Sequence, residues 1–233
     1  MKIFRKRLLR GALRARGVAV IIDVYRAFSC TPLLFSLGIK SSLLVSTPAE
    51  AFCLKKEDSG LILIGEIGGA PIAGFDFGNS PSQILNAETG WFTDKIVVQR
   101  TSSGVQGVIA ALAAADEVLL GSYGLAASTA RYIMSRKPKE VSLVAMGWDL
   151  SKIAPEDEWC ARYLAHLLGS GEYNHSQALR EMVFHETTQK FLRRDVPYFP
   201  AEDPILCLQR DIYDFVLRAR QQEDLVIVDK IEG

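Results

Sequence analysis

The sequence predicts a three-layer α/β/α sandwich with a largely parallel or mixed central sheet. Short aliphatic runs, such as VAVII from residue 18, are typical of strands that are buried on both faces. These runs alternate with helix signals for at least five rounds along the 233 residues, a pattern that indicates repeated strand–helix units. We therefore expect a single α/β domain over residues 1–233, with a helical C-terminal portion from about residue 155.

The first 17 residues form a basic segment with seven lysines and arginines and no acidic residue. Three interpretations are open: a transit-like peptide, a nucleic-acid-binding arm, or an ordinary first element with a solvated basic face. Apolar residues such as Phe4 and Leu8 give the segment a side to bury, and no basic patch interleaved with aromatic residues recurs later in the chain. We favour the ordinary element and expect no nucleic-acid partner.

Strands and helices alternate through the first half of the chain. Thr31-Pro32, Thr47-Pro48 and Ser80-Pro81 each place a capping hydroxyl before a proline, a combination that starts helices. Helices are therefore expected to begin at residues 32, 48 and 81, and the first two to end near residues 37 and 56. The expected strands comprise residues 18–23, 41–45 and 61–64.

The second half repeats this alternation and then becomes helical. The expected strands comprise residues 95–99, 117–120 and 141–146, and the expected helices residues 105–114, 125–135, 155–168, 176–192 and 204–220. The last helix would carry an apolar stripe of Ile205, Leu208, Ile212, Phe215 and Ala219. Residues 225–228 are expected to add an edge strand.

Composition narrows the class of protein. No apolar run approaches the roughly 20 residues of a membrane helix, so no membrane association is expected. The four cysteines lie far apart with no CxxC pair, which argues against a disulfide framework or a zinc site and for a reducing compartment. We expect a cytoplasmic protein, and the sequence leaves a homodimer open.

A glycine-rich stretch, LILIGEIGGAPIAGFDFGNSP, extends from Leu61 to Pro81. After its first four residues it holds five glycines, and Glu66 and Asp76 are its only charged residues. Such a loop costs conformational entropy, which indicates a backbone shaped for a purpose. Carboxylates on it would suit Mg²⁺, which takes one or two carboxylates plus substrate phosphate oxygens. The alternative is a surface connection with solvated carboxylates.

Polar residues also follow the other predicted strands, at the sheet edge where α/β folds bind ligands. Asp23 and Arg26 follow the first strand, and an ion pair between them would orient the arginine. The RTSSG turn after the fourth strand would cradle a phosphate or sulfonate with helix N–H groups, hydroxyls and a guanidinium. Helix capping by one serine is the alternative there. The turn comprises Arg100, Thr101, Ser102, Ser103 and Gly104.

Glu156 and Asp157 open the helix that follows the sixth strand. Acidic residues in a first turn complement the helix dipole, which is the simpler interpretation of this pair. Cys160 lies one turn later, and no arginine follows it at the spacing of cysteine phosphatases, since position 166 is a histidine. We therefore expect Cys160 not to be a nucleophile.

Several of these segments together resemble the 2-phosphosulfolactate phosphatase family, in the family's order and spacing over roughly residues 18–168. The matching segments are IDVYRAFS from Ile22, GEIGGAPIAGFDFGNSP from Gly65, the RTSSG turn, LLGSYGLAAS from Leu119 and EDEWCARYL from Glu156. The resemblance implies a Mg²⁺-dependent acid phosphatase of α/β/α fold that acts on 2-phospho-3-sulfolactate. It nominates as site positions Asp23, Arg26, Glu66, Asp76, Asn79, the RTSSG turn, Glu156, Asp157 and Cys160.

The chain departs from the family pattern at three places in polar loops. RTSSG replaces a Thr-Thr-Asn-Gly-Thr turn, Ile67 replaces the arginine of Gly-Glu-Arg-Gly-Gly, and Leu125 replaces an asparagine. One cation is thus lost at Ile67 and one gained at Arg100. We therefore expect Arg100 to hold a second acidic group of the substrate, and a phosphorylated acid other than 2-phosphosulfolactate to be turned over better.

The sequence thus predicts a phosphoric monoester hydrolase for a small anionic phosphomonoester, 2-phosphosulfolactate or a related phospho-acid. The expected catalytic residues are Asp23, Glu66, Asp76 and Asp157, and the expected Mg²⁺ ligands are Glu66, Asp76 and Asp23. The expected phosphate-binding residues are Arg26, Asn79, Arg100, Thr101, Ser102, Ser103 and Gly104. Asp23 stays open as metal ligand, nucleophile or general base. A non-catalytic binding protein for a small phosphate or sulfonate is the alternative function.

Overall fold

The computed structural model describes residues 1–232 and contains one mixed sheet of ten strands, so the predicted α/β fold is confirmed. The strand order is β1-β8-β2-β7-β9-β10-β3-β6-β4-β5. The strands are β1 (Lys2–Arg7), β2 (Val18–Ile22), β3 (Ser41–Leu44), β4 (Ile62–Ile67), β5 (Ala70–Pro71), β6 (Ile96–Arg100), β7 (Glu117–Gly121), β8 (Glu140–Ala145), β9 (Phe215–Gln222) and β10 (Leu225–Glu232).

Two parallel groups make up most of the sheet. β1, β8, β2 and β7 form one group, and β3, β6 and β4 form the other. The antiparallel hairpin β9–β10 pairs with β7 on one side and with β3 on the other. Three successive antiparallel pairings therefore separate the groups, and β3, β6 and β4 run opposite to the first group along the sheet.

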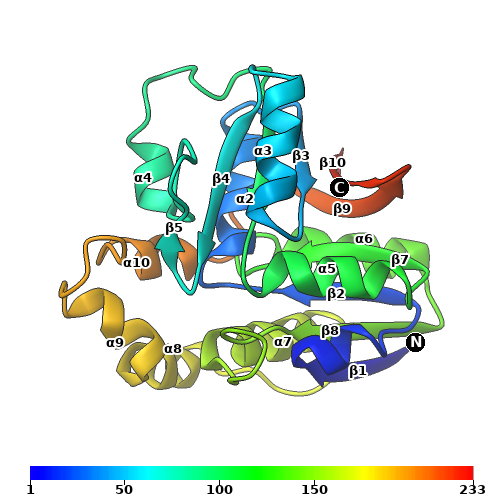
Figure 1. The fold of residues 1–233 in the computed structure, drawn as a ribbon. Coiled ribbons are helices and arrows are strands. Elements are labelled where there is room, and N and C mark those ends of the chain that lie inside the picture. The colour runs from blue at the N-terminus through cyan, green and yellow to red at the C-terminus, as the bar shows by residue number, and fades with distance from the viewer. Residues whose placement is uncertain (233) are drawn as a thin grey trace.

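Twist brings the carboxyl ends of the two groups together. In a flat sheet, groups of opposite direction would end at opposite edges. Adjacent strands rotate by roughly 20–25°, however, and the rotation accumulates across the hairpin. Figure 1 shows β2, β7 and β8 running across the view while β3 and β4 stand upright, and β4 ends near the end of the first group. The result is a corner at which β2, β8, β4 and β6 all terminate.

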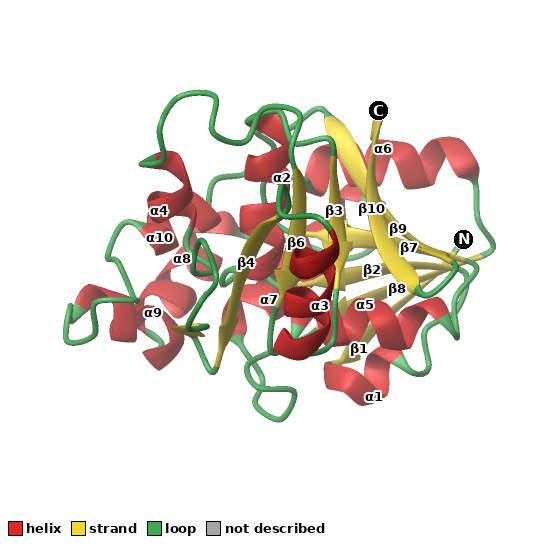
Figure 2. Ribbon diagram, turned by 45° about the horizontal axis from the view of Figure 1, so that its top comes forward, coloured by secondary structure: helices red, strands yellow, loops and turns green. Residues whose placement is uncertain are grey.

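Helices cover both faces of the sheet and complete the three layers (Figure 2). On one face α2 and α5 pack with alternate strand residues such as Ile21 and Val97. On the other face α6, α7 and α8 pack with residues such as Val20, and α3 packs over Val98. Both sides of each central strand are therefore buried, which explains the continuous aliphatic runs. The helices are α1 (Leu8–Ala12), α2 (Ala27–Ser36), α3 (Pro48–Glu57), α4 (Pro81–Leu85), α5 (Gly104–Leu112), α6 (Ala126–Arg136), α7 (Pro155–Leu167), α8 (His175–Phe184), α9 (Glu186–Leu192) and α10 (Asp203–Cys207).

Most predicted elements occur with small shifts at their ends. Thr47 and Ser80 cap α3 and α4 as predicted, each accepting a backbone N–H three residues on. The predicted helix start at residue 32 is wrong, because α2 already begins at Ala27, whose N–H donates to the Asp23 carboxylate.

The basic N-terminal segment is an ordinary element, since β1 pairs with β8 along its whole length. No helix within residues 1–232 is long and apolar enough to cross a membrane.

The C-terminal part differs most from the prediction. The helix expected over residues 176–192 is interrupted at His185, which has extended backbone dihedrals and caps α9 with its ring. The helix expected over residues 204–220 is wrong: α10 ends at Cys207, and β9 follows from Phe215. Pairing with β7 and β10 overrides the apolar stripe that favoured a helix. Residues 225–228 lie inside β10, which is an interior strand and not an edge strand.

The strand assignment of β9 leads to a stability prediction. Leu217 is fully buried, whereas Ile212 is half exposed in the turn before β9. We expect Leu217→Ala to lower the free energy of unfolding by about 2–5 kcal/mol, and Ile212→Ala by less than about 1 kcal/mol. Urea denaturation of both variants measures the difference. The reverse order would contradict the strand, because the helical stripe contains Ile212 and omits Leu217.

Candidate active site

A small pocket lies at the corner where β2, β4, β6 and β8 end. Helices α9 and α10 and the segment between them lie beside this corner in both ribbon views (Figures 1 and 2). A larger hollow lies at the opposite ends of the strands, near Val18 and Glu117, and contains none of the predicted site residues. The pocket is lined by Asp23, Tyr25, Arg26, Glu66, Gly69, Asn79, Ser102, Ser103, Gly147, Trp148, Lys190, Phe191 and Phe199.

Asp23 follows β2 and is 5% exposed. The backbone N–H of Ala27 donates to its carboxylate, so it caps α2, and its Oδ2 lies against Gly104 at the start of α5. A side chain at Gly104 would not fit, because a Cβ there would lie 2.8 Å from Asp23 Oδ2. Burial, followed by the nearby charge of Glu66, raises the pKa of Asp23 to about 7. The carboxyl group of Asp23 thus has a pKa close to neutral pH.

Glu66 lies near the end of β4 and is held by the turn after β6. Its Oε1 accepts the N–H of Ser102 at 2.6 Å, and its Oε2 accepts the Ser102 hydroxyl at 3.1 Å and the N–H of Gly69 at 2.6 Å. Gly69 has φ +89°, and a Cβ there would clash with Phe199, so this turn requires glycine. These bonds fix the Glu66 carboxylate in the pocket wall.

The RTSSG turn serves the chain's own carboxylates. The N–H of Ser102 donates to Glu66, Gly104 lies against Asp23, and the Thr101 hydroxyl accepts the N–H of Val105 as a cap for α5. Ser102 and Ser103 line the pocket. The predicted phosphate cradle is therefore largely occupied by carboxylates of the protein, and Ser103 is the residue of the turn that keeps a pocket-facing position with few internal bonds.

Arg100 does not line the pocket. Its Nη1 donates to the carbonyl of Glu66 at 2.6 Å, and its Nε donates to the carbonyl of Ser46 at 3.3 Å. The guanidinium thus braces the ends of β4 and β3. The expectation that Arg100 holds a second acidic group of the substrate is not supported by this position.

Asp157 and Glu156 are buried behind the pocket. Asp157 Oδ1 accepts the N–H of Val24 at 2.7 Å, and its Oδ2 accepts the N–H of Gly147 at 2.8 Å, so it joins the ends of β2 and β8. Glu156 accepts the Thr187 hydroxyl at 2.8 Å and so fastens α9. Burial raises the pKa of both carboxyls, that of Asp157 well above its usual range. Asp157 was predicted to be catalytic, but its position makes it a positioning residue for the two loops.

Arg26 is paired with Asp203 and not with Asp23, so the predicted ion pair is wrong. Its Nη1 donates to Asp203 Oδ2 and to the carbonyl of Tyr198, both at 2.9 Å, and its Nη2 donates to the carbonyl of Gly69 at 3.1 Å. Asp203 is fully buried and also accepts hydrogen bonds from Ser80 and Ser82. Arg26 therefore anchors the segment before α10 against the corner of the sheet.

Asn79 contributes an oxygen atom that has no partner in the described part of the chain. The residue is 4% exposed, lines the pocket, and its Oδ1 accepts no hydrogen bond. A buried amide oxygen without a donor costs free energy unless a bound group satisfies it. This atom is therefore free to contact a group bound in the pocket.

Lys190 of α9 is a pocket residue that the sequence analysis missed. Its Nζ lies 4.0 Å from the ring centroid of Trp148, 4.7 Å from that of Phe199 and 5.3 Å from that of Phe191. Burial lowers its pKa to about 8, partly opposed by the negative charges of Glu156, Glu66 and Asp23. A lysine in a predicted amphipathic helix reads as a solvated residue, so the sequence held no signal for this position.

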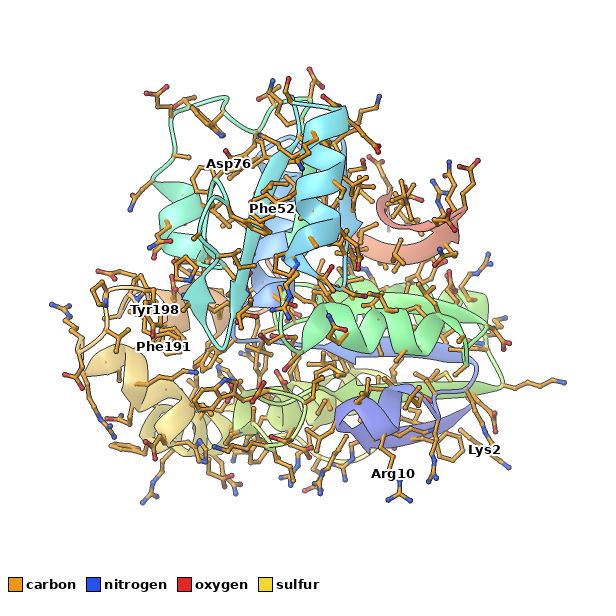
Figure 3. All side chains as sticks on the ribbon, viewed as in Figure 1. Lys2, Arg10, Phe52, Asp76, Phe191 and Tyr198 are labelled. Carbon is orange, nitrogen blue, oxygen red and sulfur yellow. The ribbon has the colours of Figure 1, made fainter. Side chains whose placement is uncertain are left out.

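Asp76 is a predicted metal ligand that lies outside the pocket. Asp76 Oδ2 accepts the N–H of Leu63 at 2.8 Å and pairs with Lys55 at 3.4 Å. Leu63 and Glu66 are three residues apart on β4, so about 10 Å separates the two attachment points. Figure 3 shows Asp76 well away from Phe191, which lines the pocket. The structure therefore separates the carboxylates that were expected to share a metal ion.

Cys160 also lies away from the pocket. It is fully buried among apolar residues on one face of the sheet, and burial raises the pKa of its thiol well above the usual range. A thiol of this kind is inert, because the thiolate is the nucleophilic form. This environment fits the expectation that Cys160 is not a nucleophile.

Comparison with known proteins identifies similar chains. A family model described as 2-phosphosulpholactate phosphatase matches residues 3–222. A probable 2-phosphosulfolactate phosphatase of Bacillus subtilis is 28% identical over 223 residues, which is 94% of each chain. Another, of Deinococcus radiodurans, is 31% identical over 67% of this chain and 64% of its own length. A third, of Caldicellulosiruptor saccharolyticus, is 36% identical over 64% of this chain and 61% of its own length.

The buried carboxyl group of Asp23 leads to a pH prediction. Its pKa is raised in the folded state, so the folded protein holds a proton that the unfolded chain releases above about pH 4. The contribution of Asp23 to stability therefore falls as the pH rises from about 4 to about 7. We expect the wild type, in a chelating buffer, to lose up to about 4 kcal/mol over this range relative to Asp23→Asn. Urea denaturation of both proteins at several pH values measures this loss, and parallel pH profiles would contradict it.

Proposed function

The chain belongs to the 2-phosphosulpholactate phosphatase family, and from this premise we propose that it is a Mg²⁺-dependent hydrolase of a small anionic phosphomonoester. One observation supports this proposal above the others: Asp23 and Glu66 line the same small pocket as Lys190. Carboxylates suit a divalent cation, and the ammonium suits an anionic substrate. The relatives are named after 2-phosphosulfolactate, which is thus the first substrate to test.

The oxygen atoms of the pocket fit Mg²⁺. Asp23 and Glu66 supply two carboxylates, and the unpartnered Oδ1 of Asn79 supplies a neutral oxygen in the same pocket. Glu66 Oε1 accepts a single hydrogen bond, so a lone pair stays free. Mg²⁺ typically binds through one or two carboxylates plus substrate phosphates, and when bound it would polarise the phosphoryl group. Asp76 is excluded from the proposed ligands by its distance along β4.

The protein's own residues prepare this pocket in three ways. The backbone N–H of Ser102, before α5, holds the carboxylate of Glu66 in place, and that of Ala27 in α2 holds the carboxylate of Asp23. Arg26, paired with Asp203, holds the segment before α10 against the pocket. Lys190 leaves a positive charge facing the substrate. Positioning and charge stabilisation of this kind account for most of the catalysis of phosphoryl transfer.

Turnover of a panel of phosphomonoesters, with Mg²⁺ and with a chelator, tests the proposed activity. We expect release of inorganic phosphate from 2-phosphosulfolactate or another short phospho-acid with Mg²⁺, and at least a 100-fold lower rate with the chelator. Saturable binding of these compounds without phosphate release would instead favour the alternative, a non-catalytic binding protein for small phosphates or sulfonates.

Substitution of the carboxylates tests the proposed metal ligands. We expect Asp23→Asn and Glu66→Gln each to weaken Mg²⁺ binding at least tenfold, because each removes an anionic ligand. Asp76→Asn is the matched control and should keep the wild-type affinity, since Asp76 lies elsewhere on β4. Calorimetric titration measures the affinities, and thermal unfolding verifies that each variant is folded. Loss of binding in Asp76→Asn alone would contradict the assignment.

A further inference from the structure

Lys190 is a cation of the pocket that forms no direct ion pair with a carboxylate among residues 1–232. Nζ lies against the rings of Trp148, Phe191 and Phe199, and forms no hydrogen bond or ion pair with any residue from 1 to 232. Attraction to ring faces holds an ammonium in place without using its N–H donors. Arg26 differs, because its guanidinium is paired with Asp203 and bonded to two carbonyl groups. Lys190 therefore keeps three donors for a ligand.

The surroundings of Lys190 show which kind of ligand group it can take. The rings offer no hydrogen-bond acceptor, so the donors of the ammonium stay available to a ligand at that wall of the pocket. The ammonium lies close enough to Glu156, Glu66 and Asp23 to be affected by their charges, and Glu156 is engaged by Thr187. A compact anion that reaches the wall would gain a charge-assisted hydrogen bond in place of water.

We propose that Lys190 is a specificity-determining residue that binds a second acidic group, a carboxylate or sulfonate, of a short phosphorylated acid. The inference rests on the proposed phosphatase function, in which Asp23 and Glu66 serve the phosphoryl group. A neutral substituent at this wall would not gain the charge-assisted hydrogen bond that an acidic group gains from Lys190. The pocket thus selects for a short substrate with two acidic ends.

Two small probes that differ in one group test this inference. 2-Phosphoglycolate carries a carboxylate where ethyl phosphate carries a methyl group. We expect the wild type to prefer 2-phosphoglycolate, and Lys190→Met to reduce the ratio of the two kcat/KM values by about 10-fold to 100-fold. Lys190→Arg keeps the charge and should restore most of the ratio. An unchanged ratio in Lys190→Met would overturn the proposal, whether or not total activity falls.

Lys152→Met is the matched control. Lys152 Nζ lies 5.4 Å from the centroid of the same Trp148 ring, but the residue is exposed and does not line the pocket. We expect Lys152→Met to keep the ratio of the two kcat/KM values within about twofold of that of the wild type. A drop equal to that of Lys190→Met would show that loss of a cation beside Trp148, and not binding by Lys190, causes the effect.

Calorimetric binding of the same probes separates this inference from the proposed function. If the wild type hydrolyses neither probe, the phosphatase proposal fails on these substrates, but the binding comparison still decides the role of Lys190. The proposal requires the wild type to bind 2-phosphoglycolate more tightly than ethyl phosphate. It also requires Lys190→Met to reduce the ratio of the two dissociation constants at least tenfold. Equal affinities of the wild type for both probes would overturn it.

Discussion

The contact between Asp23 and the start of α5 joins the two halves of the sheet. Asp23 belongs to the group of β2, and Gly104 follows β6 in the other group. Gly104 packs directly against the Asp23 carboxylate, and the absent side chain at Gly104 allows this approach. A hydrogen bond from the Gln99 side chain to the carbonyl of Ala27 reinforces the same junction. The pocket exists because these contacts hold two sets of strand ends, which run in opposite directions along the sheet, at one corner.

The sequence predicted correctly that residues after several strands meet in one pocket, but the reason given for their meeting was incomplete. Asp23, Glu66 and Ser102 do meet, as expected for residues that follow strands. The expectation assumed that neighbouring parallel strands end at a common edge, whereas the β9–β10 hairpin reverses the second group. Twist supplies the convergence instead. The hairpin could not be predicted from local pattern, because residues 215–222 form a strand only through pairing with β7 and β10.

Residues that are close together in a short sequence motif can lie far apart in the folded protein. Glu66 and Asp76 lie ten positions apart in one glycine-rich stretch. They were predicted to bind one metal ion only because both are carboxylates. The chain folds back so that Asp76 meets Leu63, at the beginning of β4, while Glu66 stays near its end. Arg100 shows the same effect, because its guanidinium turns to the carbonyls of Glu66 and Ser46. Side-chain direction, which residue type does not specify, decides which motif residues reach the pocket.

The remaining wall of the pocket comes from segments distant in sequence. Lys190 and Phe191 lie on α9, and their position depends on two buried polar contacts: Glu156 with Thr187, and Arg26 with Asp203. A buried ion pair contributes little net stability, yet losing one partner leaves an uncompensated charge, so the pair fixes where the segment lies. The sheet corner thus holds the carboxylates, and α9 with the segment after it holds the cation and the rings of Phe191 and Phe199. In the proposed function, the carboxylates at the sheet corner serve the phosphoryl group and Lys190 selects the rest of the substrate, so the two tasks belong to separate parts of the chain.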